Sequence, residues 1–135
     1  MQAALLQTRP LFGDKEGNIA RACHLFEKEL KNPNLKNESH PAPKPQLLVL
    51  PELFATGYLF TSHQELKTLA EPAQPKSQEF GPTTQALIDL AQKHDCIINA
   101  GLAEEGEHDQ IFNSSVLVSP DGLLATYSEN FARDG

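Results

Sequence analysis

The sequence predicts an α/β protein in which a mixed β-sheet is flanked by helices. Three short apolar runs, at residues 3–7, 46–50 and 96–102, are separated by segments with an apolar residue at every third or fourth position. Such runs are typical of buried strands, and such spacing is typical of amphipathic helices. Two further strands, at residues 113–119 and 123–129, are joined by Ser-Pro-Asp-Gly, which predicts a hairpin turn. Right-handed parallel crossovers followed by a hairpin make a mixed sheet.

Length and composition are those of one soluble globular domain. The chain has 135 residues, enough for a real core, and 39% of them are hydrophobic. No apolar run approaches the length of a membrane span, and the first residues lack the pattern of a secretory signal. A net charge of −7 disfavours nucleic acids and anionic membranes as partners. Two cysteines fit a reducing compartment better than a disulfide framework, so we expect a cytoplasmic protein.

The first helix is predicted over residues 15–31. Asp14 stands where an N-cap belongs, and Pro33 prevents the helix from continuing. Cys23 falls in the apolar stripe of this helix, where a small thiol packs like any other apolar side chain. Cys96 begins the third predicted strand. We interpret both cysteines as core residues.

The remaining connections are polar. Residues 32–45 are rich in proline and predict a surface loop that exposes His40 to solvent. Residues 62–65, Ser-His-Gln-Glu, form a capping box for a short helix. A second polar loop is expected over residues 71–80, and Gly-Pro at 81–82 starts another helix with proline in its first turn.

The second strand runs directly into Pro51 and Glu52. Proline has no N–H group and cannot continue a central ladder, so the strand ends there. Glu52 therefore stands at the carboxyl end of a strand, where open α/β sheets bind their ligands. The unbroken apolar run over residues 47–50 predicts a strand covered on both faces. We expect Glu52 to be partly desolvated, which suits a general base.

Residues 50–58, Leu-Pro-Glu-Leu-Phe-Ala-Thr-Gly-Tyr, resemble the glutamate motif of the nitrilase superfamily of carbon–nitrogen hydrolases. Residues 4–20 resemble the first strand and helix of that family. Ala-Gly-Leu-Ala-Glu at residues 100–104 and Phe-Asn-Ser-Ser-Val-Leu-Val-Ser-Pro-Asp-Gly at residues 112–122 resemble its central block. The resemblance implies about half of the αββα sandwich of the family. Residues 1–135 are then the N-terminal part of an incomplete carbon–nitrogen hydrolase domain.

The resemblance also implies a Glu-Lys-Cys mechanism on small amides, carbamoyl compounds or nitriles. The position of Glu52 is that of the general base, which takes a proton from a cysteine thiol. The thiolate attacks the amide or nitrile carbon, and a lysine stabilises the oxyanion that develops. Glu104 matches a supporting glutamate of the family. We expect no cofactor and no metal, because the acidic loop over residues 104–109 lacks the spacing of a calcium loop.

Two features depart from the family pattern. The lysine belongs in a Tyr-Arg-Lys pattern, but residues 127–129 are Tyr-Ser-Glu, so Glu129 takes its place and reverses the charge. The nearest basic residue beyond it is Arg133. The nucleophilic cysteine belongs further downstream, and neither Cys23 nor Cys96 has a comparable context. Because members of a catalytic set act as a unit, we predict that the isolated chain is inactive.

Several alternatives stay open. The chain is a truncated product, a fragment, or a partner that has drifted from catalysis. A non-catalytic subunit or interaction module derived from the family is the main rival function. A flavodoxin-like binding domain is a second rival, but the sequence has no glycine-rich phosphate loop. Half of a sandwich exposes an apolar sheet face or an unpaired edge, so we expect self-association or a homo-oligomer.

Overall fold

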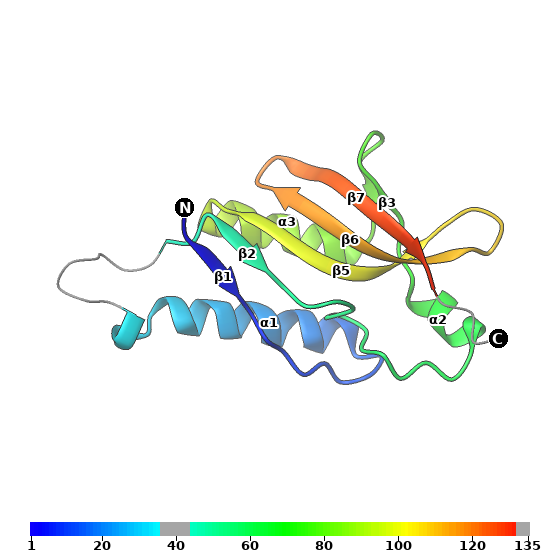
Figure 1. Cartoon of the computed structure of the whole chain (residues 1–135), viewed down its shortest axis with the longest axis horizontal. Coiled ribbons are helices and arrows are strands. Elements are labelled where there is room, and N and C mark those ends of the chain that lie inside the picture. Colours follow the sequence, from blue (N-terminus) through cyan, green and yellow to red (C-terminus); the bar gives the residue numbers. More distant parts are fainter. Residues whose placement is uncertain (36–43, 132–135) are drawn as a thin grey trace.

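The computed structural model describes residues 1–35 and 44–131. Its main feature is a five-stranded mixed sheet with the strand order β1-β2-β5-β6-β7 (Figure 1). The first three of these strands run parallel, and β6 and β7 add antiparallel to β5 as a hairpin. The predicted mixed sheet is therefore confirmed. The five strands are β1 (Ala3–Leu5), β2 (Leu47–Val49), β5 (Ile97–Glu105), β6 (Ile111–Ser119) and β7 (Gly122–Asn130).

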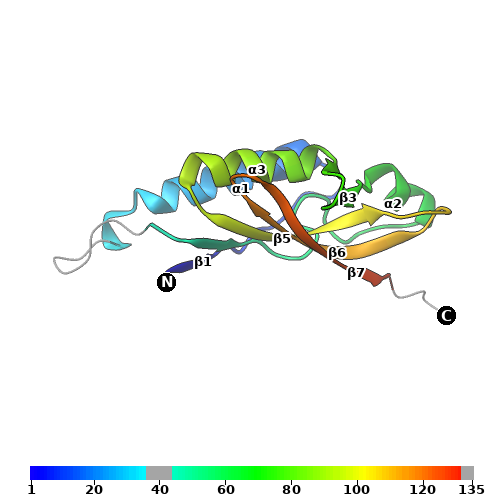
Figure 2. The ribbon, with the colours of Figure 1, turned by 90° about the horizontal axis from the view of Figure 1, so that it is seen from above.

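Two long helices cover the same face of this sheet. They are α1 (Lys15–Leu30) and α3 (Pro82–His94), and Figure 2 shows both on one side of the strands. A third helix, α2 (His63–Leu69), is short. Inside residues 1–35 and 44–131, no helix combines the length and the apolar character of a membrane span. No helix of the described part of the chain lies on the opposite face of the sheet in either view (Figures 1 and 2).

Because the helices lie on one side, the two faces of the sheet differ in burial. Leu48 in β2 points toward the helices and is fully buried, whereas Leu47 and Val49 beside it are half-buried. The expectation that this strand is covered on both faces is therefore wrong. We call the uncovered side the open face. Its central cross-strand row, from β1 to β7, is Leu5, Val49, Asn99, Leu117 and Ala125.

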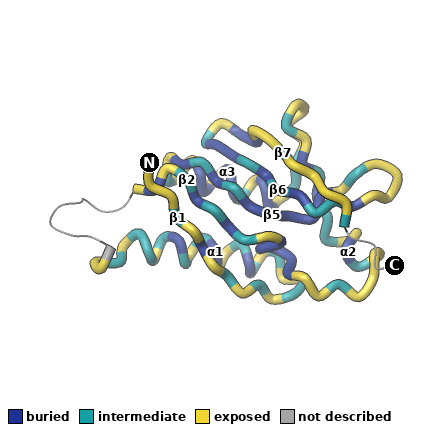
Figure 3. The backbone as a smooth tube through the Cα atoms, in the orientation of Figure 1, coloured by how far each residue is buried: buried dark blue, intermediate teal, exposed yellow. Residues whose placement is uncertain are grey.

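The core lies between the covered face and the two long helices. Ala22 and Phe26 of α1 and Leu87 of α3 pack against the sheet, as the sequence periodicity predicts. Cys96 is buried in this core and Cys23 lies at its margin, so their interpretation as core residues is confirmed. In Figure 3 the buried residues follow β5 and β6, while β1 and β7 at the sheet edges are largely exposed.

The predicted helix starts are also confirmed. Asp14 caps α1 by accepting from the Gly17 N–H, and Ser62 caps α2 by accepting from the Glu65 N–H at 3.1 Å. The capping box is modified, however, because Glu65 accepts from the backbone N–H and hydroxyl of Thr61. The loop after α1 contains one 3-10 turn, Pro33–Leu35, and His40 lies outside the described residues.

The segment before α3 differs from the predicted plain loop. Two short strands, β3 (Ala73–Gln74) and β4 (Glu79–Phe80), pair as a small hairpin. Glu71 precedes them and is 4% exposed. Its carboxylate accepts from the Thr83 N–H at 2.7 Å and from the Lys15 ammonium at 2.9 Å. Glu71 thus caps α3 from outside the helix and connects the first turns of both long helices to the sheet edge. Local sequence patterns do not reveal these contacts.

The strands β5 and β6 extend further than their apolar patterns predict. β5 continues to Glu105 and β6 starts at Ile111, and these two residues pair directly. Polar residues continue a ladder when one face of the sheet is open, because only the other face requires apolar side chains. Of the candidate site residues on these strands, Glu104 lies in this extension.

Candidate active site on the open face

A tight loop after β2 positions Glu52. The backbone at Leu53 is left-handed, with φ of 47°, and its carbonyl accepts from the Thr56 and Gly57 N–H groups. A branched residue in this region is uncommon, and such conformations gather at functional sites. Leu53 and Phe54 are buried and anchor the loop. The Tyr58 hydroxyl closes it by donating to the Glu52 carbonyl at 2.6 Å.

Gly101 on β5 lets this loop rest directly on the sheet. A Cβ atom at Gly101 would lie 2.6 Å from the Cα of Glu52 and 2.9 Å from the backbone nitrogen of Leu53. No real Cβ contact is that short, so only glycine fits without moving the backbone. The carboxyl end of β2 thereby comes to lie over the middle of β5.

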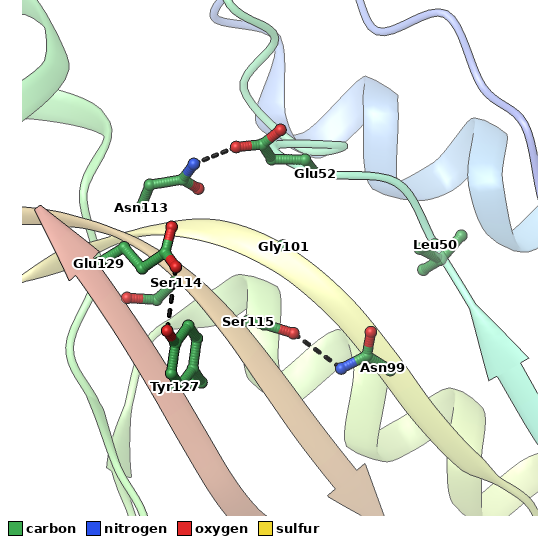
Figure 4. A pocket seen from close by; sticks show the side chains of 9 residues that line it. All are labelled: Leu50, Glu52, Asn99, Gly101, Asn113, Ser114, Ser115, Tyr127 and Glu129. Carbon is green, nitrogen blue, oxygen red and sulfur yellow. Dashed lines mark hydrogen bonds between the residues drawn. The ribbon is translucent and has the colours of Figure 1, made fainter. Parts of the chain in front are cut away.

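Glu52 lines a cavity of about 230 Å³ on the open face (Figure 4). β5, β6 and β7 supply its floor, and their lining side chains, apart from that of Ser114, point away from the covering helices. Glu129, which occupies the place of the family lysine, lies in the same cavity and accepts from the Tyr127 hydroxyl at 3.0 Å. The lining residues are Leu50, Glu52, Asn99, Gly101, Asn113, Ser114, Ser115, Tyr127 and Glu129.

Asn113 bonds to the Glu52 carboxylate of this cavity and was not singled out by the sequence. Its side-chain N–H donates to Oε1 of Glu52, and its backbone position on β6 is directly opposite Glu129 on β7 (Figure 4). A signal was present, since alternation along β6 puts Asn113 and Ser115 on the same face. Which face lies under Glu52, however, depends on contacts with β2.

The electrostatic character of the cavity is acidic. Within residues 1–35 and 44–131, its lining includes Glu52 and Glu129 and no lysine, arginine or histidine. Glu52 itself is exposed, so the expected partial desolvation is wrong for the described chain. The physical reason is that the cavity opens on the uncovered face of the sheet. Among the described residues, no group of three potential metal ligands is assembled.

Glu104 lies away from this cavity. It follows Leu102 in the alternation of β5, so its side chain is on the covered face, where it is 5% exposed. Both the Ser114 and the Ser128 hydroxyls donate to its Oε2. Glu104 therefore joins β5 to β6 and β7 next to Asn113 and Glu129, but it does not face the same space as Glu52.

Neither cysteine of the chain reaches the cavity. Cys23 lies on α1 and Cys96 lies just before β5, and both thiols are free. Burial raises the pKa of the Cys23 thiol, and the nearby carboxylate of Glu27 raises it further. Burial, followed by the charge of Asp95, likewise raises the pKa of Cys96. Both groups therefore favour the unreactive thiol form.

In α/β proteins, ligands usually bind at the carboxyl ends of parallel strands. The Glu52 carboxylate follows an inner parallel strand and faces a cavity on the open face. Fold and site together are therefore those of an α/β protein with a ligand site. Comparison with known proteins specifies it further. The family model of the carbon–nitrogen hydrolases matches residues 2–130. The chain therefore belongs to the carbon–nitrogen hydrolase family.

The curated relatives include a nitrilase and two amidases. The chain is 34% identical over 127 residues to a nitrilase of Pyrococcus abyssi, covering 94% of the chain and 42% of the nitrilase. It is 24% identical to the protein N-terminal amidase of Saccharomyces cerevisiae, of which it covers 27%. It is 28% identical to the omega-amidase of the same yeast, covering 38% of that protein. The chain thus spans less than half the length of these relatives.

Solved structures confirm the fold. An N-terminal amidase superposes with a TM-score of 0.79 at 22% identity, covering 98% of this chain and 28% of that one. The Nit3 protein of Saccharomyces cerevisiae, a member of the nitrilase superfamily, superposes with a TM-score of 0.72 at 28% identity, covering 94% and 43%. The α/β architecture expected from the resemblance is therefore that of the family.

Proposed function

We propose that residues 1–135 are the N-terminal part of a carbon–nitrogen hydrolase domain and supply its general base. The observation that carries this proposal is the placement of Glu52, at the end of β2, over Gly101 and at the mouth of the open-face cavity. Asn113 donates to one carboxylate oxygen, which leaves the other oxygen to accept a proton.

The chemistry that Glu52 would serve is acyl transfer to a thiol. Glu52 takes the proton of a cysteine Sγ–H, and the sulfur attacks the carbonyl carbon of an amide or the carbon of a nitrile. With an amide, the tetrahedral intermediate collapses to a thioester as the proton returns to the leaving ammonia or amine. Water then hydrolyses the thioester, and Glu52 again accepts the proton. The substrate class is a small amide, carbamoyl compound or nitrile; two of the three curated relatives described above are amidases, which favours the amide.

We propose further that this chain by itself does not turn such substrates over. The oxyanion of the intermediate requires positive charge, and the cavity instead presents Glu129 beside Glu52. The thiol must come from another segment, since Cys23 and Cys96 are in or beside the core. Two free thiols are consistent with a protein of the cytosol, which is a reducing compartment.

Ammonia release tests the proposed inactivity. The 135-residue chain, kept reduced, is incubated with a panel of carboxamides, carbamoyl compounds and nitriles, with Glu52→Gln as the matched control. We expect both proteins to give the buffer rate. Turnover by the wild type that Glu52→Gln abolishes would overturn the inactivity, and turnover that survives this substitution would also overturn the role of Glu52.

A chimera tests the role of Glu52 directly. This chain replaces the corresponding segment of the Pyrococcus abyssi nitrilase, and Glu129→Lys restores the positive charge. We expect amide or nitrile hydrolysis by the Glu129→Lys chimera and at least a hundredfold lower rate, as general-base loss typically gives about 10²–10⁴, when Glu52→Gln is added. Equal rates with and without Glu52→Gln, in a folded chimera, would contradict the proposal.

A non-catalytic subunit of the family is the second candidate function. The negative charge of Glu129 in the cavity favours it, because a drifted partner has no need to stabilise an oxyanion. Mixing the chain with a full-length relative from the same cells tests this candidate. A stoichiometric complex whose amidase rate is insensitive to Glu52→Gln would support it over the catalytic proposal.

A further inference from the structure

A second cavity, of about 150 Å³, lies between the loop after β1 and the helix α1. It shares no lining residue with the cavity of Glu52. Residues 7–10 form one wall, α1 forms another, and Phe54 and Leu25 provide apolar surface. The cavity is thus built by the carboxyl end of a parallel strand, a place where α/β sheets bind ligands.

The polar lining of this cavity is basic, although the chain carries a net charge of −7. Among the described residues Arg9 and Arg21 line it and no aspartate or glutamate does, and Arg21 is ion-paired with Asp14 just outside the lining. Arg9 is exposed and makes no ion pair or side-chain hydrogen bond within residues 1–35 and 44–131. Its guanidinium group is therefore available to a ligand.

Arg21 is held in place by a buried amide. Its Nη2 donates to the Oδ1 of Asn18 at 2.6 Å and to the Oδ2 of Asp14 at 3.0 Å. Asn18 is 3% exposed, and its side chain donates to the carbonyls of Leu11 and Ala55 at 2.7 Å each. Arg21 is thus oriented before any ligand arrives, which lowers the entropy that binding must offset.

Thr8 also lines this cavity and carries an unpaired hydroxyl group. Its Oγ1 is buried and has no hydrogen-bond partner among the described residues. Buried hydroxyl groups are normally paired, and the described residues provide no partner for this one. A ligand acceptor in the cavity would satisfy it.

We propose that this cavity binds a small oxyanion, a phosphate or carboxylate group. Guanidinium groups are shaped for such oxygens, and the Thr8 hydroxyl donates to an acceptor of the same kind. Water occupies about 30 Å³ per molecule in the liquid, so the cavity has room for a group of four or five heavy atoms. The loop of Glu52 contributes Phe54 to its wall, but the proposal does not depend on catalysis by Glu52.

Titration by two-dimensional NMR of the whole 135-residue chain tests the proposal. Sodium phosphate is added in one arm and sodium acetate in the other, at constant ionic strength so that screening does not change. We expect saturable shifts of the Thr8, Arg9 and Arg21 signals in at least one arm. The arm with the tighter binding identifies phosphate or carboxylate. Shifts that are absent or fail to saturate in both arms would overturn the proposal.

Three variants separate a built site from general attraction to positive charge. Arg9→Gln, at an exposed position, is expected to weaken binding about tenfold, that is by one unit in log Kd. Thr8→Val keeps the side-chain shape, removes the unpaired hydroxyl, and is expected to weaken binding without lowering the melting temperature. Lys93→Gln removes the same charge from α3, outside the cavity lining, and should leave Kd unchanged. Equal weakening by Lys93→Gln and Arg9→Gln would overturn the proposal.

Discussion

The backbone of Glu52 lies so close to Gly101 that a methyl group on Gly101 would come within 2.6 Å of the Glu52 Cα. The two residues are far apart in the sequence: Glu52 lies in the loop after β2, and Gly101 lies in β5, the parallel neighbour of β2. Their contact sets the height of the Glu52 carboxylate above the open face. It also explains why the resembling segment over residues 100–104 contains a glycine where β5 would otherwise accept a larger side chain.

Gly101→Ala is therefore expected to destabilise the fold and move the Glu52 loop. The added methyl group meets backbone atoms, which cannot rotate away, so we expect a loss of about 3 kcal/mol, the upper range for overpacking. Chemical denaturation measures this loss, and the NMR signals of residues 51–58 report the displacement.

Gly13→Ala is the matched control for that substitution. A Cβ at Gly13 meets no atom within 4 Å, but its φ of 76° costs about 1 kcal/mol for alanine. The Gly13 N–H donates to the Thr56 carbonyl at 2.9 Å, so the signals that should not move in this variant are those of residues 51–54, around Glu52. Equal stability losses and an unmoved Glu52 loop in both variants would contradict the steric explanation.

Glu71→Ala should destabilise the protein severely. The substitution removes the carboxylate that accepts from the Thr83 N–H and the partly buried Lys15 ammonium, which keeps only the Leu69 carbonyl, and breaking a buried pair costs about 3–5 kcal/mol. Asp109→Ala removes the partner of an exposed lysine, Lys67, and is expected to change the melting temperature little. Thermal denaturation of both variants checks this contrast, and similar melting temperatures would show that Glu71 contributes no more than a surface charge.

The two cysteines should resist alkylation at pH 8 in the native protein. Burial raises the pKa of both thiols above the ordinary value of 9.0, so the folded state holds the protonated form. Stability from this source is present below the unfolded pKa and is lost as the pH rises through the higher folded pKa. We therefore expect slow reaction with iodoacetamide at pH 8, rapid reaction in urea, and declining stability above pH 9.

Single Cys23→Ala and Cys96→Ala variants assign the residual reactivity. Cys23 is the more accessible of the two, so it should account for most of the slow native reaction. Rapid native alkylation of Cys96 at pH 8 would contradict its place in the core.

The open face should drive self-association. Leu5 on this face is 80% exposed and Tyr127 is 67% exposed, and such apolar surface is normally covered. Sedimentation analysis should show concentration-dependent association that Leu5→Lys weakens. Leu59→Lys, at a similarly exposed leucine outside the sheet, is the control and should have no effect. A wild-type chain that stays monomeric at high concentration would contradict this prediction.

Local sequence patterns determined most of the elements. The stripe that includes Ala22 and Phe26, the caps at Asp14 and Ser62, and the alternation in the final hairpin each depend on neighbours within a few residues. Glu52 was predictable for the same reason, because Pro51 ends the strand locally. These features need no knowledge of the rest of the chain.

Only the tertiary structure decided which side chains meet. Both Glu104 and Glu129 lie toward the ends of strands, yet Glu104 faces the helices while Glu129 faces Glu52. Asn113 became part of the site for the same reason. The physical cause is that strand residues alternate between faces, and which face is covered depends on where α1 and α3 pack. That packing joins residues distant in sequence, and no local pattern specifies it.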